Sequence, residues 1–134
     1  NHDTILGPIA KKRNLEIVDN YLVDDLFLVH GDRIPSDLPT SVKTIIIGHE
    51  HPAISLKQGP RVEKYKCFLK GKFKGYNLIV LPSFNPLIEG TDILKENLLS
   101  PLLEDANIRN FEVFIYGDKT YRFGKIKEIV KHMK

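Results

Sequence analysis

Cysteines and long apolar runs are both scarce in this sequence, and each scarcity excludes a class of protein. Cys67 is the only cysteine, so the chain has no internal disulfide and no cysteine-rich zinc site. We therefore expect a cytoplasmic protein in which Cys67 serves as a small buried hydrophobic residue. No apolar run approaches the roughly 18 residues that a membrane span requires, so we expect no membrane partner.

A strong charge bias is also lacking. The net charge is +3 and charged residues make up 28% of the chain, less bias than a dedicated nucleic-acid binder shows, although a polyanionic substrate is permitted. The first residues are polar and do not form a signal peptide. With 134 residues, 42% of them hydrophobic, the chain has enough apolar material for one core, and no second domain is needed.

Short strands dominate the predicted secondary structure. Residues 26–29 are a continuous apolar run, which predicts a strand buried on both faces, and residues 42–47 predict a second strand. The mixture of strands with about three helices favours an α/β or α+β sheet structure. Further strands are predicted at 15–18, 19–23, 53–57, 61–69, 77–81, 111–116 and 120–123, helices at 4–13, 94–103 and from 125 onward, a basic hairpin tip at 70–75 and a packed covering loop at 82–90.

Histidines follow two of the predicted strands. His30 comes directly after the strand at 26–29, and His49 and His51 come after the strand at 42–47. In open α/β sheets such strand ends are where ligands bind. Two imidazoles one residue apart can bind one metal or two neighbouring metals, although they can also lie together by chance. Imidazole, carboxamide and carboxylate ligands without cysteine suit a hydrolytic site for manganese, iron, nickel or zinc.

Three motifs occur in a fixed order: Asn1-His2-Asp3, then His30-Gly31, then Gly48-His49-Glu50-His51. Together with Pro52-Ala53 and the segments at 65–69 and 81–84, they resemble the later motifs of the calcineurin-like metallophosphoesterases. The resemblance is to the small prokaryotic and archaeal branch that includes the DNA-ligase-associated type, and it runs from Asn1 to about Gly90. It implies an α/β fold, the C-terminal part of a four-layer αββα sandwich, with a mixed β-sheet and about three flanking helices.

The resemblance also implies a role for each motif residue. His2 would stabilise the transition state or protonate the leaving oxygen, with Asp3 orienting it. The cofactors would be two divalent metal ions about 3.5 to 4 Å apart, which activate water for in-line attack on phosphorus. Manganese is the expected metal, with iron, nickel, zinc and magnesium as alternatives. The implied metal ligands are Asn1, His30 and His49 for one ion and His51 for the other, while Glu50 is expected to be structural.

The expected function is hydrolysis of phosphodiesters or phosphomonoesters, with nucleic acids or nucleotides as plausible substrate classes by resemblance. The alternative is a catalytically inert metal-binding domain that acts through a partner as a scaffold. Nothing in the sequence fixes an oligomeric state, and an oligomer is compatible with it.

One departure from the family limits this expectation. The family's Asp-x-His and Gly-Asp-x-x-Asp/Asn motifs, which complete the first metal site and bridge the two ions, are not found before Asn1, and no Asp-x-His follows. We therefore expect residues 1–134 to be the C-terminal portion of a single phosphoesterase domain. The N-terminal half would be cut from the same chain or supplied by a separate polypeptide, and we expect the first. The chain alone is expected to be inactive.

Overall fold

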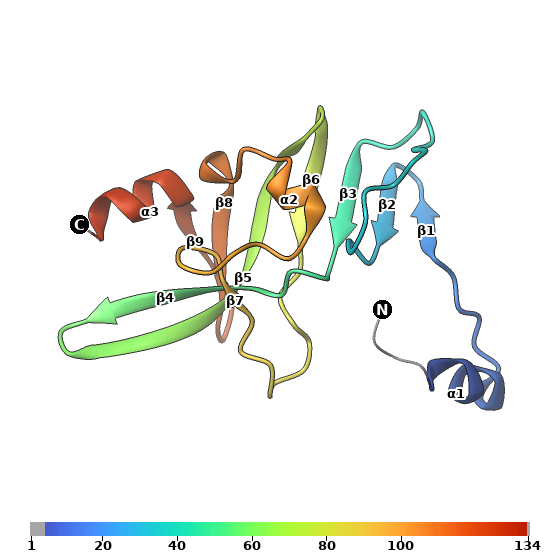
Figure 1. The fold of residues 1–134 in the computed structure, drawn as a ribbon, viewed down its shortest axis with the longest axis horizontal. Helices are drawn as coiled ribbons and strands as arrows, with labels where there is room; N and C mark the ends of the chain where they lie inside the picture. The colour runs from blue at the N-terminus through green and yellow to red at the C-terminus, as the bar shows by residue number, and fades with distance from the viewer. Residues whose placement is uncertain (1–4, 134) are drawn as a thin grey trace.

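The computed structural model describes residues 5–133 and shows an α/β protein with a mixed β-sheet and a few helices (Figure 1). This confirms the α/β class, the mixed sheet and the few helices that were predicted. At the centre of the sheet three parallel strands lie side by side: β2 (Leu26–Val29), β3 (Thr44–Ile47) and β6 (Tyr76–Val80). The sheet as a whole does not follow chain order, because β6 pairs with β3 while β4 (Pro52–Gln58) and β5 (Arg61–Phe73), which precede β6 in the sequence, lie beyond it.

Antiparallel strands extend the sheet on both sides. β1 (Asn20–Val23) pairs with β2 at one edge. On the other side the long strand β5 pairs with β4 through its first half and with β6 and β8 (Glu112–Tyr116) through its second half. The two remaining strands are β7 (Thr91–Asp92), which pairs with β4, and β9 (Thr120–Lys125), which pairs with β8. The distal part of the β4–β5 hairpin projects from the body as an arm (Figure 1).

Helices lie at opposite ends of the molecule, α1 (Leu6–Arg13) beyond β1 and α3 (Ile126–His132) beyond β9 (Figure 1). Both were expected, with slightly different bounds. The apolar spacing at 94–103 predicts a helix, while Ser100-Pro101 could equally mark a new first turn, and the structure has the second: a short helix α2 (Pro101–Glu104) begins at the proline. It is followed by a 3-10 turn, η1 (Ile108–Asn110). Among residues 5–133, no helix combines the length and the apolar content needed to cross a membrane.

The hydrophobic core covers one face of the sheet. Ile45 pairs with Leu78 and Val80 pairs with Leu69, which places these four fully buried side chains on the same face. The helices close the core with Leu102, Leu103, Ile126 and Ile129.

The opposite face is only partly covered, so the prediction that residues 26–29 are buried on both faces is wrong. Phe27 points into the core with 4% of its surface exposed, whereas Leu28, on the other face, is 37% exposed.

Two further local predictions are wrong, and a third, the hairpin tip at 70–75, is correct in part. Residues 15–18 form no strand. The turn predicted at 70–75 is confined to Lys74 and Gly75, because β5 continues to Phe73. The loop at 82–90 is not a packed cover, because the side chains of Phe84 and Leu87 are 104% and 87% exposed.

Cys67 has the buried position that was predicted for it. It is 0% exposed, and burial raises the pKa of its thiol to about 12, with Asp92 adding to the shift. Because the thiolate is the reactive form, we expect the native protein to resist iodoacetamide at pH 8, with a rate roughly a thousandfold below that of the unfolded chain. Mass spectrometry before and after unfolding in guanidinium measures this, and rapid labelling of the native protein would contradict the buried position.

Candidate functional site

The candidate site lies where β2 and β3 end. The two strands are parallel neighbours, so His30, which follows β2, and His49, which follows β3, reach the same edge of the sheet. The backbone fixes this approach, since the N–H groups of Gly48 and His49 both donate to the carbonyl oxygen of His30, at 3.0 and 2.9 Å. The two strand ends that were expected to meet are therefore held together by hydrogen bonds.

The imidazoles of His30 and His49 converge. His30 Nε2 lies 3.1 Å from His49 Nδ1, and the rings meet edge to face with centroids 4.9 Å apart. One of these nitrogens carries a hydrogen and donates to the other. Two imidazole ligands about 2.1 Å from one ion and about 90° apart would also be separated by about 3 Å, so the pair fits one divalent metal.

His51 lies two residues further on, in a different backbone conformation. Its φ is +49°, its N–H donates to the Gly48 carbonyl over 3.3 Å, and its own carbonyl accepts from the N–H of Thr91 over 3.0 Å. Burial and the neighbouring His49 and Lys66 lower the pKa of His51. Burial and His49 also lower the pKa of His30. Both shifts favour the neutral imidazole, which is the form that binds metals.

Glu50, between the two histidines, is fully buried and ties the site to a distant segment. Its Oε2 accepts from the backbone N–H groups of Leu99 and Ser100, each at 2.8 Å. The hydroxyl of Ser100 in turn donates to the carbonyl oxygen of Gly31 over 2.7 Å, so one segment contacts both histidine loops. Glu50 is structural, as expected. Burial raises the pKa of Glu50, although hydrogen bonds from the two N–H groups and from the Thr91 side chain oppose the shift.

Two lysines of β5 that sequence reasoning missed hold the loop at 82–90 beside the site. Lys66 Nζ donates to the carbonyl oxygens of Ser83 and Asn85, at 3.1 and 2.5 Å. Lys64 Nζ donates to the Gly90 carbonyl at 3.3 Å and to Glu96 Oε1 at 3.1 Å. No motif reveals these contacts, because most of the acceptors are backbone carbonyls far along the chain.

The other predicted site residues, Asn1, His2 and Asp3, lie outside the described residues. Within residues 5–133 no three histidine, cysteine, aspartate or glutamate side chains form a group that could hold a metal ion. The structure therefore brings together His30 and His49, with His51 nearby.

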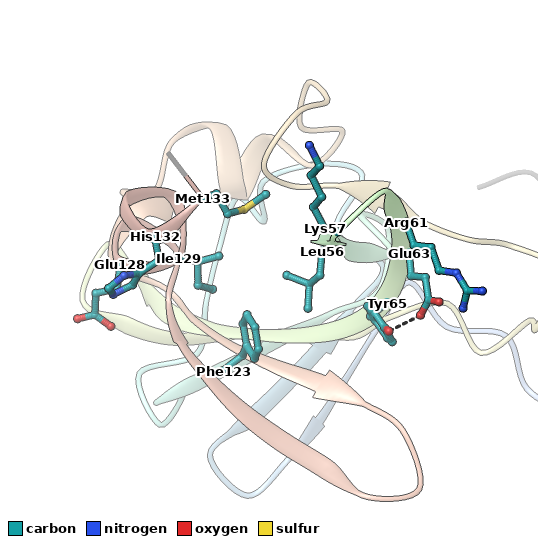
Figure 2. A pocket seen from close by; sticks show the side chains of 11 residues that line it. Leu56, Lys57, Arg61, Glu63, Tyr65, Phe123, Glu128, Ile129, His132 and Met133 are labelled. Atoms are coloured by element: carbon teal, nitrogen blue, oxygen red, sulfur yellow. Dashed lines mark hydrogen bonds between the residues drawn. The ribbon is translucent and has the colours of Figure 1, made fainter.

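One surface hollow borders a candidate histidine, and a larger one lies elsewhere. A hollow of about 350 Å³ is lined by His30, Gly48 and Leu81 together with Tyr21 and Leu28 from the sheet. A larger one of about 970 Å³ lies between the β4–β5 arm and α3 (Figure 2). None of the candidate site residues lines it; its walls are apolar side chains rimmed by charges, among them Leu56, Phe123, Ile129, Lys57, Arg61 and Glu128. We place the site beside the smaller hollow, because His30, one of the two convergent imidazoles, lines it.

Comparison of the chain with family models, with curated proteins and with solved structures found no match.

Proposed function

We propose that this chain carries part of the metal centre of a dinuclear-metal-dependent phosphoesterase. The observation that carries the proposal is the approach of His30 Nε2 to His49 Nδ1, 3.1 Å apart at the carboxyl edge of two parallel strands. The motif resemblance assigns both residues to one metal ion, and two converging nitrogens are what such an assignment requires.

Each side chain of the site has a definite task in this proposal. His30 and His49 hold one divalent ion, manganese being the expected metal, and Asn1 completes its protein ligands. His51 binds the second ion, and its lowered pKa keeps the imidazole neutral at pH 7. His2, oriented by Asp3, protonates the leaving oxygen. When bound, a pair of divalent ions polarises the phosphoryl group and activates water at neutral pH.

A second layer of polypeptide completes the domain in this proposal. On the outward face of the sheet Tyr21, Leu28, Ile46 and Ile79 pair in register and form an apolar row across four strands. Tyr21 is 60% and Leu28 37% exposed, although parallel strands are normally covered on both faces. The apolar row supports a four-layer sandwich in which the polypeptide with the Asp-x-His and Gly-Asp motifs packs on this face and supplies the missing carboxylates.

The metal assignment is tested by binding of Zn²⁺ to the chain, followed by calorimetry and by the histidine NMR resonances. We expect one weakly held ion that shifts the signals of His30 and His49, and an affinity at least about tenfold lower in His49→Ala, because one of two converging ligands is lost. His132→Ala, which removes an exposed histidine of α3, is the matched control and should bind as the parent does. Equal affinity in the parent and His49→Ala would overturn the assignment.

The reaction is tested with bis-p-nitrophenyl phosphate and Mn²⁺. The 134-residue chain alone should release negligible nitrophenol, because the imidazoles of His30, His49 and His51 cannot by themselves hold a pair of metal ions. Addition or fusion of the polypeptide that carries the two missing motifs should restore turnover, and His49→Ala should abolish it. Turnover that persists in His49→Ala would exclude the proposed roles, and a completed domain that binds metal but never turns over would favour the inert scaffold.

A further inference from the structure

The loop between β6 and β7, residues 81–90, presents an aromatic side chain to solvent beside the candidate site. Phe84 is 104% exposed, more than any other large apolar side chain described, and Leu87 is 87% exposed. Full exposure of a phenylalanine forfeits the favourable burial of roughly 1.5–3 kcal/mol that it would gain in a core. Because the protein also holds this loop in place, the exposed ring has a fixed position, as a side chain that binds a ligand requires.

Both ends of this loop are joined to the histidine segment. At its start, the N–H of Leu81 donates to the Ile47 carbonyl over 2.8 Å, directly before Gly48 and His49. At its end, the N–H of Thr91 donates to the carbonyl of His51 over 3.0 Å. Phe84 follows Leu81 by three residues, which limits the separation of their Cα atoms to about 11 Å. The ring is therefore presented within reach of a substrate whose phosphate lies at His49.

The middle of the loop is held rigid. Lys66 donates to two of its carbonyls, of Ser83 and Asn85, on either side of Phe84. The Asn85 side chain accepts from the N–H of Leu87 at 2.9 Å, and the Ser83 hydroxyl donates to the Asn85 carbonyl at 3.3 Å. Prolines at 82 and 86 restrict the backbone further. A preorganised ring loses little conformational entropy when it binds.

From these observations we infer that Phe84 is a stacking platform for a nucleobase adjacent to the phosphate that the histidine site holds, so that single-stranded nucleic acid or a nucleotide is the substrate class. The inference rests on the proposed function for the position of the phosphate. A base is favoured over an apolar protein surface because the residues on either side of Phe84, Ser83 and Asn85, are polar and their carbonyls are bonded to the cationic Lys66, on a protein whose net charge of +3 permits a polyanionic ligand. Aromatic rings next to cationic groups are typical of single-strand binding sites.

The test is the affinity of the chain, with Zn²⁺ present, for a fluorescent oligothymidylate of eight nucleotides and for an abasic oligonucleotide of the same length and charge. We expect the oligothymidylate to bind about tenfold more tightly, and Phe84→Ala to remove this difference, because one stacked base contributes about that factor. Phe84→Tyr should retain the preference. Leu87→Ala, which truncates the other exposed side chain of the loop, should leave it unchanged.

The outcomes separate this inference from the proposed function. Equal affinity for the two oligonucleotides, or a preference that survives Phe84→Ala, would overturn the stacking role. An equal loss in Leu87→Ala would also overturn it, because the base would then contact the apolar side chains of the loop in general and not the Phe84 ring in particular. The role of His49 is judged independently by Zn²⁺ affinity, so a base preference that persists in His49→Ala, together with unchanged metal binding, would refute the proposed function alone.

Discussion

Replacing Glu50 with alanine is expected to lower the free energy of unfolding by about 3 kcal/mol at neutral pH, because two backbone donors lose their acceptor. The N–H groups of Leu99 and Ser100 both donate to Glu50 Oε2, and Ser100 is fully buried, so water cannot replace the carboxylate there. Denaturation in urea, followed by circular dichroism, measures the change. A loss below about 1 kcal/mol would show that the segment at 99–100 is held by other contacts.

Glutamine at position 50 is the matched control, because its carbonyl oxygen can accept from the same two donors while carrying no charge. Burial raises the pKa of Glu50 above its ordinary value of 4.5. The folded protein therefore binds more protons than the unfolded chain between pH 4.5 and the raised pKa, so stability falls as the pH rises through that window. Relative to the parent, Glu50→Gln should gain stability as the pH is raised from about 4.5, and a constant difference would contradict the raised pKa.

Much of the candidate site was predictable because it depends on local sequence and on one rule of sheet geometry. An apolar run followed by histidine and glycine occurs twice, and parallel strands bring their carboxyl ends to one edge. That reasoning was sufficient to expect His30 and His49 at strand ends, and the family resemblance added the expectation that the two bind one ion. The α/β class followed in the same way from the number of short apolar segments and the three helical patterns.

The hydrogen bonds that tie the site to the rest of the fold could not be predicted from the sequence, because the residues they join are far apart in the chain and follow no motif. The acceptor for two N–H groups at residues 99 and 100 is Glu50, about 50 positions earlier, and any carboxylate or carbonyl would serve equally well. The apolar spacing at 94–103 predicts a helix, yet the segment is used to reach Glu50 and Gly31, and Pro101 starts its own turn. Tertiary contacts thus decide where local preference is weak.

Gly90 offers the sharpest test of how the loop and the histidine segment are joined. Its φ is +93°, and a Cβ atom there would lie only 2.2 Å from the carbonyl oxygen of His51, which is backbone and cannot turn aside. Gly75 has nearly the same φ, +90°, with no atom within 4 Å of a Cβ. The pair therefore separates the cost of the backbone conformation from the cost of the contact.

Gly75→Ala should cost about 1–2 kcal/mol of unfolding free energy, the strain of a side chain at positive φ. Gly90→Ala should cost that amount plus a further 1–3 kcal/mol, roughly, for overpacking against His51. Moving the His51 carbonyl also weakens its bond to Thr91 and exposes the imidazole, so the lowered pKa of His51 should return toward 6.5 in Gly90→Ala alone. Urea denaturation and NMR titration of the histidines measure both effects. Equal destabilisation by the two substitutions, with no change at His51, would show that the loop and the histidine segment are not mechanically coupled.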